Sequence, residues 1–192
     1  MVHNMERLTI RDYSWGISRS TGERSERLLE EKVFDGPFEV GQIFALKQTN
    51  KTFELLNIID DGLEIVFSPK KNVVLKGFKV QRPLPSALSM DGGHHYEFLY
   101  EYDYLDVMDE EHNLISRFKY VLGKTYHLPE KYKRQIYIGP DCGFNLDEVT
   151  ILSDGRINFA YDDFRLENDV ENYRTPLKAG PNFYFKLHLI ER

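Results

Sequence analysis

The segment from His95 to Leu105 alternates between two kinds of side chain, and this alternation limits the fold more than any other feature of the sequence. Its even positions, Tyr96 to Tyr104, are all aromatic, whereas most of its odd positions hold histidine or an acid. Successive side chains of a strand point to opposite faces, so the aromatic rings would share one face of a sheet. A helix would scatter them around its circumference. We therefore expect a β-strand here with one aromatic, buried face.

The same period of two recurs along most of the chain. It is found in five further runs: Phe38, Val40, Phe44 and Leu46; Phe53, Leu55 and Ile59; Leu63, Ile65 and Phe67; Ile157, Phe159 and Tyr161; Phe183, Phe185, Leu187 and Leu189. Asp-Gly turns separate some of the runs, and they predict hairpins at Asp60-Asp61-Gly62 and at Ser153-Asp154-Gly155-Arg156. Many short strands joined by such turns predict an all-β fold, an antiparallel β-sandwich or jelly roll.

Helix is expected in two short segments at most. Ser20–Val33 has a helix-favouring, charged composition, but Leu28-Leu29 gives it only a narrow apolar stripe, so a charged edge strand fits equally well. Asp163–Tyr173 spaces three apolar residues as a helix does and starts with acids. We predict a short helix there, with an acidic loop as the alternative.

The chain is expected to fold as one sandwich domain over residues 1–192. It is 41% hydrophobic and 29% charged, the balance of a globular protein. Phe38–Leu46 is similar in pattern to Tyr120–Leu128, and the order of later elements is also alike, which suggests an internal repeat of about 33–108 and 115–192. A true duplication would pack two related halves face to face, but alternating strands also resemble one another for physical reasons alone.

Charge and composition narrow the classes of partner and the compartment. The net charge of −6, from 25 basic and 31 acidic residues, argues against a nucleic-acid binder, which needs a basic face. No apolar run approaches the roughly 18 residues of a membrane span, so we expect no membrane partner. The lone cysteine, Cys142, and the lack of an apolar signal core predict a cytoplasmic protein without disulfides.

The charges are segregated along the chain. Residues 97–111 hold seven acids and no Lys or Arg, whereas the charged residues of 68–82 and 117–134 are almost all basic. Two explanations remain open. The acidic and basic strips either pair across neighbouring strands or dock a charged partner.

The most site-like cluster surrounds His95 and Glu97. On one face of a strand, an imidazole and a carboxylate two residues apart lie about 7 Å from each other, close enough to share a metal ion. The further ligands would have to come from His127 or His188. We expect no other cofactor, because no phosphate-binding loop or paired-cysteine motif is present.

This cluster and Gly123–Pro129 superficially resemble a cupin, whose β-barrel holds a metal with histidine and glutamate. The resemblance implies a metalloenzyme with His95 and Glu97 as ligands. The chain departs from the cupin pattern because His94 and His95 are adjacent, where the first cupin motif has one residue between its histidines, and because the second motif is absent.

Aromatic residues offer another kind of site. Trp15, beside Gly16, and Tyr96 are candidate platforms on which a sugar ring or another small ligand would stack. The alternative is that both rings belong to the core, since aromatic residues commonly fill sandwich interiors.

The sequence carries no complete catalytic motif, and we expect a protein that binds and does not catalyse. Our first expectation is a protein-interaction or self-assembly module that forms an oligomer, because strand edges and segregated charges both favour association. A carbohydrate or small-ligand binder is the second expectation, and a cupin-like metalloenzyme is the third.

Overall fold

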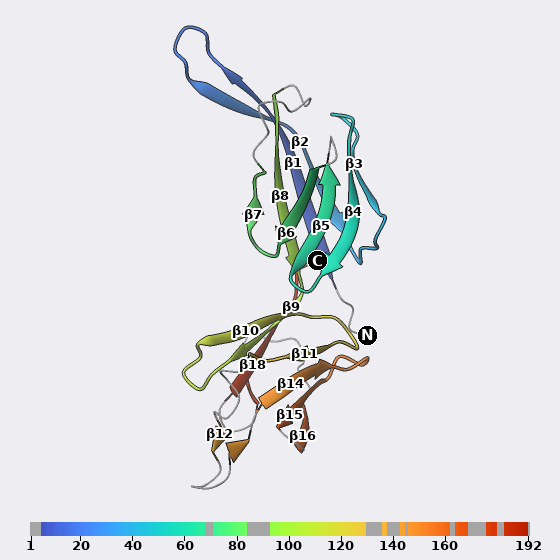
Figure 1. Cartoon of the computed structure of the whole chain (residues 1–192), viewed down its shortest axis with the longest axis vertical. Helices are drawn as coiled ribbons and strands as arrows, with labels where there is room; N and C mark the ends of the chain where they lie inside the picture. Colours follow the sequence, from blue (N-terminus) through green and yellow to red (C-terminus); the bar gives the residue numbers. More distant parts are fainter. Residues whose placement is uncertain are drawn as a thin grey trace. The chain divides into compact units, whose positions relative to one another are not determined.

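The computed structural model describes residues 5–67, 71–83, 93–129, 136–137, 143–144, 146–161, 164–168, 176–179 and 183–191. All the regular structure in these ranges is β-strand (Figure 1). The all-β, sandwich-like fold predicted from the alternation is therefore confirmed. Since the described ranges contain no helix, they also contain none that is long and apolar enough to cross a membrane.

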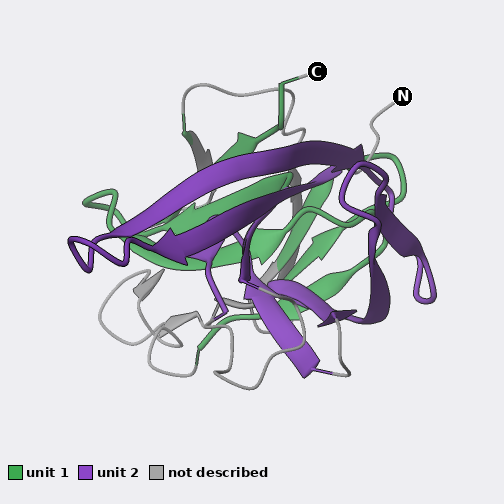
Figure 2. Ribbon diagram, turned by 90° about the horizontal axis from the view of Figure 1, so that it is seen from above, with its two compact units in different colours: residues 1–5, 102–192 green, residues 6–101 purple. Residues whose placement is uncertain are grey.

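The chain divides into two compact units, coloured separately in Figure 2. Unit 2 comprises residues 6–101, and unit 1 joins residues 1–5 to residues 102–192. These bounds differ from the predicted halves of about 33–108 and 115–192. Unit 2 begins at residue 6 and ends at residue 101. A single domain and an internal duplication both stay predictions.

Where the structure describes it, unit 2 contains two four-stranded sheets. The first has the order β2-β1-β8-β7, with β2 at Arg24–Asp35, β1 at Glu6–Ile17, β8 at His94–Tyr102 and β7 at Val80–Gln81. The second has the order β3-β4-β5-β6, with β3 at Ile43–Leu46, β4 at Lys51–Ile59, β5 at Gly62–Phe67 and β6 at Lys71–Lys76.

The described residues of unit 1 also form two four-stranded sheets, together with a short strand pair. The first sheet has the order β10-β9-β18-β17, with β10 at Leu114–Lys119, β9 at Tyr104–Met108, β18 at Phe183–His188 and β17 at Leu177–Ala179. The second has the order β11-β14-β15-β16, with β11 at Thr125–His127, β14 at Leu146–Ile151, β15 at Ile157–Tyr161 and β16 at Phe164–Asn168. The pair consists of β12 at Ile136–Tyr137 and β13 at Gly143–Phe144.

The core of unit 2 is built on the even-numbered face of β8, as its alternation predicts. Tyr96, Phe98 and Tyr100 are buried. The ring of Phe53 in β4 lies edge-on to both Tyr96 and Phe98, with each centroid 5.4 Å away. Such edge-to-face pairs are the favoured arrangement of aromatic rings. They show that the two sheets of unit 2 face each other.

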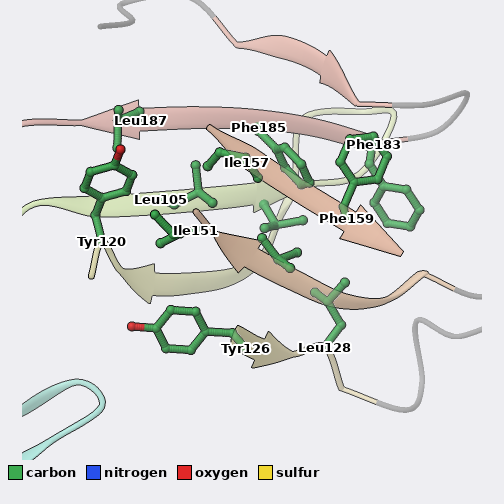
Figure 3. Close-up of a cluster of buried hydrophobic side chains, with 12 residues drawn as sticks. Leu105, Tyr120, Tyr126, Leu128, Ile151, Ile157, Phe159, Phe183, Phe185 and Leu187 are labelled. Carbon is green, nitrogen blue, oxygen red and sulfur yellow. The ribbon is translucent and has the colours of Figure 1, made fainter. Parts of the chain in front are cut away.

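The core of unit 1 is a cluster of twelve buried residues, shown in Figure 3. Phe183, Phe185 and Leu187 of β18 alternate inward, and Phe185 meets Phe159 of β15 edge-on at 5.2 Å. The predicted run also included Leu189, which is exposed because β18 ends at His188. In the run that starts at Phe38, Val40 is exposed for the same reason, since it lies in a turn before β3 begins.

Both predicted hairpins are present. Asp60 and Asp61 connect β4 to β5, where Ile59 pairs with Gly62. A Cβ at Gly62 would lie only 2.0 Å from the backbone oxygen of Leu75, so the close approach of β6 requires glycine there. The second hairpin joins β14 to β15, and Gly155 has the positive φ of 90° that this turn needs.

The two segments for which a helix was considered contain strands and no helix where the structure describes them. Within Ser20–Val33, residues 24–33 lie in β2, the outermost strand of its sheet, so the edge-strand alternative is the correct one. The helix predicted over Asp163–Tyr173 is wrong for residues 164–168, which form β16. Pairing with β15 supplies the backbone hydrogen bonds that a helix would otherwise provide. The remaining residues of that segment lie outside the described ranges.

The buried apolar residues are even-numbered before Asp103 and odd-numbered after it, so their parity changes at this residue. Up to Tyr102 the buried aromatic residues of β8 are even-numbered, whereas in β9 Leu105 and Val107 are fully buried. Asp103 lies between the two strands and belongs to neither. As a result Tyr104, which the alternation placed in the aromatic row, is only half-buried and stacks on the ring of His188 at 4.3 Å.

The carboxylate of Asp103 is buried and bonded to the backbone at both ends of unit 1. Its Oδ2 accepts the amide hydrogen of Met5 over 2.8 Å, and its Oδ1 accepts that of Ile190 over 2.7 Å. Its own backbone N–H donates to Met5, and its carbonyl accepts the N–H of Tyr120. A charged acceptor forms stronger hydrogen bonds than a neutral one, so this residue fixes the place where the parity changes.

We expect Asp103→Asn to lower the free energy of unfolding by about 1–3 kcal/mol, because the amide group offers one acceptor and directs a donor at the second backbone N–H. Urea unfolding followed by circular dichroism measures the loss. Asp61→Asn is the control, since the side chain of Asp61 forms an exposed ion pair with Lys76, and it should change stability by less than about 0.5 kcal/mol. Equal effects of the two variants would contradict the role of Asp103.

Candidate functional site

The candidate site is the outer face of the sheet β2-β1-β8-β7 in unit 2. Strand β1 turns Leu8, Ile10 and Asp12 inward, where they are fully buried. The alternate residues Arg11 and Tyr13 therefore lie on the outer face, together with Trp15. On β8 the same logic places His95 and Glu97 outward, because the buried Tyr96 and its even-numbered neighbours point into the core.

A β-bulge in β2 decides which of its residues reach this face. Asp12 pairs with Glu30 but Tyr13 pairs with Leu28, so Leu29 is an extra residue in β2. Glu30 is buried, and its carboxylate accepts the N–H of Thr49 over 3.0 Å. Beyond the bulge the parity is reversed, so Leu28 lies on the outer face beside Tyr13 and is 47% exposed.

Glu97 is the centre of an ion-pair network on the outer face. It is only 5% exposed, and each of its oxygens is held by a different arginine. Arg11 Nη1 lies 2.5 Å from Oε1, and Arg82 Nη2 lies 2.5 Å from Oε2. Arg11 also bonds Glu31 over 2.6 Å. The carboxylate is therefore neutralised from both sides and is not available to a further cation.

The network changes the proton affinity of its members. Burial raises the pKa of Glu97, but the hydrogen bonds from Arg11 and Arg82 outweigh burial and bring the pKa below its ordinary value of 4.5. Hydrogen bonds to Glu31 and Glu97 raise the pKa of Arg11. Glu97 and Arg11 are therefore both ionised at neutral pH.

The acidic strip of the sequence pairs with both basic strips within the described residues. Glu97 and Asp106 come from the acidic strip. They bind Arg82 and Arg117, which come from the two basic strips, with Arg117 Nε 2.8 Å from Asp106 Oδ1. These contacts favour the cross-strand explanation of the segregated charge for these residues.

His95 is buried beside this network, yet it is not part of it. It is 4% exposed, its ring centroid lies 6.3 Å from that of Tyr13, and neither ring nitrogen has a hydrogen-bond partner within the described part of the chain. Trp15 Nε1 is likewise buried without a described partner. His95 and Glu97 do share one face of β8, as expected.

The other proposed metal ligands lie in unit 1. His127 is exposed on β11, and His188 lies on β18 with Nε2 3.2 Å from Asp106 Oδ2. Burial lowers the pKa of His188 more than the nearby Asp106 raises it. No group of three or more His, Cys, Asp or Glu side chains that could hold a metal ion occurs among the described residues. The metal site stays a prediction, without support from the geometry.

The two candidate aromatic platforms are both covered. Tyr96 faces inward, and its ring lies 5.4 Å from that of Phe53 and 5.7 Å from that of Phe67. Trp15 lies on the outer face, but the guanidinium of Arg24 stands 5.1 Å from its ring centroid. A cation over the ring occupies the surface on which a sugar would stack.

Sequence reasoning missed several members of the site. Arg11 is 86 residues from Glu97, and the buried Asp12 accepts a 2.7 Å hydrogen bond from His94, which is 82 residues away. No local spacing indicates such contacts. The alternation of β1 itself, with Leu8 and Ile10 against Arg11 and Tyr13, was the available signal for one of these strands.

Beyond Trp15, β1 and β2 continue as a two-stranded ribbon. Trp15 donates its backbone N–H to Gly93, just before β8 begins, and no other described strand accompanies residues 16–25. Figure 1 shows this ribbon extending past the other strands of its sheet. Residues 24–28 of β2 are all exposed.

The direction of the Trp15 N–H also settles which groups of β2 point outward. The N–H of Trp15 points to Gly93 and therefore away from β2. Trp15 and Glu26, which lie opposite each other, are thus a pair without mutual backbone hydrogen bonds. Such pairs alternate along an antiparallel ladder. Arg24, Glu26 and Leu28 therefore direct their backbone N–H and C=O groups to the outer edge of the sheet.

Comparison with known proteins identifies no relative. No family model, no curated protein and no solved structure matches the chain.

We expect Glu97→Gln to lower the free energy of unfolding at pH 7 by about 1–3 kcal/mol, because Arg11 loses a buried charged acceptor. The native pKa of Glu97 is depressed, so its stabilising effect is complete above 4.5 and is lost as the pH falls through the lower native value. The difference between Glu97→Gln and the wild type should thus shrink at pH 3. Urea unfolding at both pH values measures it.

Glu54→Gln, on an exposed position of β4, serves as the control and should have little effect at either pH. A Glu97→Gln difference that stayed constant from pH 7 to pH 3 would mean that the ion pairs do not stabilise the fold.

Proposed function

We propose that the protein is a non-enzymatic protein-interaction module that binds a β-strand of its partner along the outer edge of β2, at residues 24–28. The observation that carries this proposal is the outward direction of the backbone groups of Arg24, Glu26 and Leu28 in an exposed strand. A strand added to such an edge gains main-chain hydrogen bonds, and the side chains of the edge select the partner.

The ribbon gains stability from such a partner. Two strands alone are marginally stable in water, and the part of the ribbon beyond Trp15 has no third strand among the described residues. The outer face of β1 and β2 also exposes Ile17 by 61% and, next to the ribbon, Leu28 by 47%. An added strand would supply a neighbour for both the backbone and these apolar side chains.

The charges on β2 make the edge selective. Arg24, Glu26 and Arg27 are all exposed on this strand. Charged side chains on an edge prevent indiscriminate pairing, because an unmatched strand would place like charges opposite each other. A partner with complementary charges is therefore preferred.

The two alternative functions have less support. Stacking of a sugar on Trp15 requires Arg24 to leave the ring, and metal binding at His95 and Glu97 requires Glu97 to give up two arginines. Edge pairing requires neither rearrangement.

Photo-crosslinking tests the proposal. The full-length protein carrying p-benzoylphenylalanine at Ser25, in the ribbon, is irradiated in its native lysate and compared with the same label at Thr52, an exposed position on the interior strand β4. We expect a discrete adduct from Ser25 only. The adduct should disappear when Glu26→Pro is added, because proline removes an outward N–H donor that the partner needs.

Proline is tolerated at an edge position whose N–H faces solvent, so circular dichroism of the Glu26→Pro protein should be unchanged. An adduct that persists in the Glu26→Pro protein, or identical adduct patterns from both labels, would contradict edge pairing.

A further inference from the structure

We infer that the strand docking on β2 is β2 of a second copy of this chain, antiparallel and centred on Ser25. This inference rests on the proposed function and names its partner. In a two-fold arrangement the same edge serves both copies, so the edge must be complementary to itself.

The sequence around Ser25 is self-complementary in charge. When Ser25 lies opposite Ser25 of the second copy, Arg24 lies opposite Glu26, and Glu23 lies opposite Arg27. Every charged residue that flanks the axis therefore faces the opposite charge. Opposite charges directly across an antiparallel pair stabilise it, and like charges destabilise it.

The backbone geometry agrees with this register. Arg24 and Glu26 are the residues whose N–H and C=O groups point to the edge, as derived from the hydrogen bond between Trp15 and Gly93. Opposite each other in two copies, they form the kind of pair that exchanges both backbone hydrogen bonds. Ser25 then forms a pair without mutual hydrogen bonds, in which side chains lie closest.

Neighbouring registers are unfavourable. In a two-fold antiparallel pair the axis must pass through a residue, because directly opposed side chains have to point to the same face. An axis through Arg24 or Arg27 places two arginines opposite each other, and an axis through Glu26 opposes two glutamates. An axis through Leu28 sets Glu26 against Glu30. Ser25 is thus the one centre between residues 24 and 28 that opposes no like charges.

The pairing closes on itself. Each copy contributes its β2 edge to the two-fold contact, so this edge is no longer available to a third copy. The product is a dimer in which two ribbons form a four-stranded sheet. Arg24 and Glu26 lie together on the outer face, where they already contact each other over 3.1 Å within one chain. In the dimer each gains an equivalent partner from the other copy.

Charge exchange tests the pairing in the full-length protein by sedimentation velocity at low salt. Arg24→Glu alone and Glu26→Arg alone should each weaken the dimer at least about tenfold, because each sets like charges across the axis. The double exchange of both residues should restore the affinity. An equimolar mixture of the two single variants should form a heterodimer, since one then presents two acids and the other two arginines.

Lys76→Glu is the control. It reverses an exposed charge on β6 and should leave association unchanged. A wild-type protein that sediments as a monomer at every concentration would overturn the inference. So would single variants that associate as well as the wild type.

Disulfide formation tests the register itself. In a background with Cys142→Ser, Ser25→Cys should oxidise to a covalent dimer, because Cα atoms of a pair without mutual hydrogen bonds lie about 4.5 Å apart, within the range of a disulfide. Arg27→Cys, which faces Glu23 in this register, should oxidise much more slowly. Equal rates would contradict the axis at Ser25.

The outcomes separate this inference from the proposed function. The crosslinked adduct formed through Ser25 should have twice the mass of the chain. An adduct with a different protein, sensitive to Glu26→Pro, would overturn self-pairing and leave edge pairing in place. Absence of any adduct, together with a monomeric wild type, would overturn both.

Discussion

The apolar side chains of β8 and β9 each gather on one face of their strand, but they are even-numbered in β8 and odd-numbered in β9, and Asp103 lies where this parity changes. Even-numbered aromatic residues are buried before it, and Leu105 and Val107 after it. A residue between two strands leaves backbone groups without ladder partners, and here the buried carboxylate and the peptide of Asp103 supply partners for Met5, Tyr120 and Ile190. These hydrogen bonds of Asp103 hold the beginning of β9 and the residues after β18 in place.

A second parity change shapes the surface that we propose as the binding site. The extra residue Leu29 lets β2 bury Glu30 on one side of the bulge and expose Leu28 on the other. It brings Arg24 and Glu26 onto the same face as Trp15. The ribbon extends beyond the first residue of β8, so no described strand lies beside it there. This face and the edge of β2 are the surfaces that we propose for a partner. Buried acids are neutralised elsewhere on the sheet, as at Glu97, whereas the charges of the ribbon remain exposed. Association therefore requires no ion pair of the core to break.

The sequence was informative about local structure and much less about the site. Alternation such as that of Phe183, Phe185 and Leu187 reflects burial on one face, and it predicted the strands and the all-β class. Asp-Gly turns predicted the hairpins because their backbone preference is local. The partner of Glu97 was not predictable, since Arg11 is 86 residues away. The bulge at Leu29 was also hidden, because the same residues favoured a helix and an edge strand equally. His95 and Glu97 were correctly placed on one face, but the arginines that occupy Glu97 were not foreseen.

Residue-resolved amide hydrogen exchange at the β2 edge measures its pairing most directly. The N–H groups of Arg24 and Glu26 point outward in the single chain, whereas those of Ser25 and Arg27 point to β1. Self-pairing therefore predicts that exchange at Arg24 and Glu26 slows as the protein concentration rises, while exchange at Ser25 and Arg27 changes far less. Rapid exchange at Arg24 and Glu26 that is the same at every concentration would contradict it.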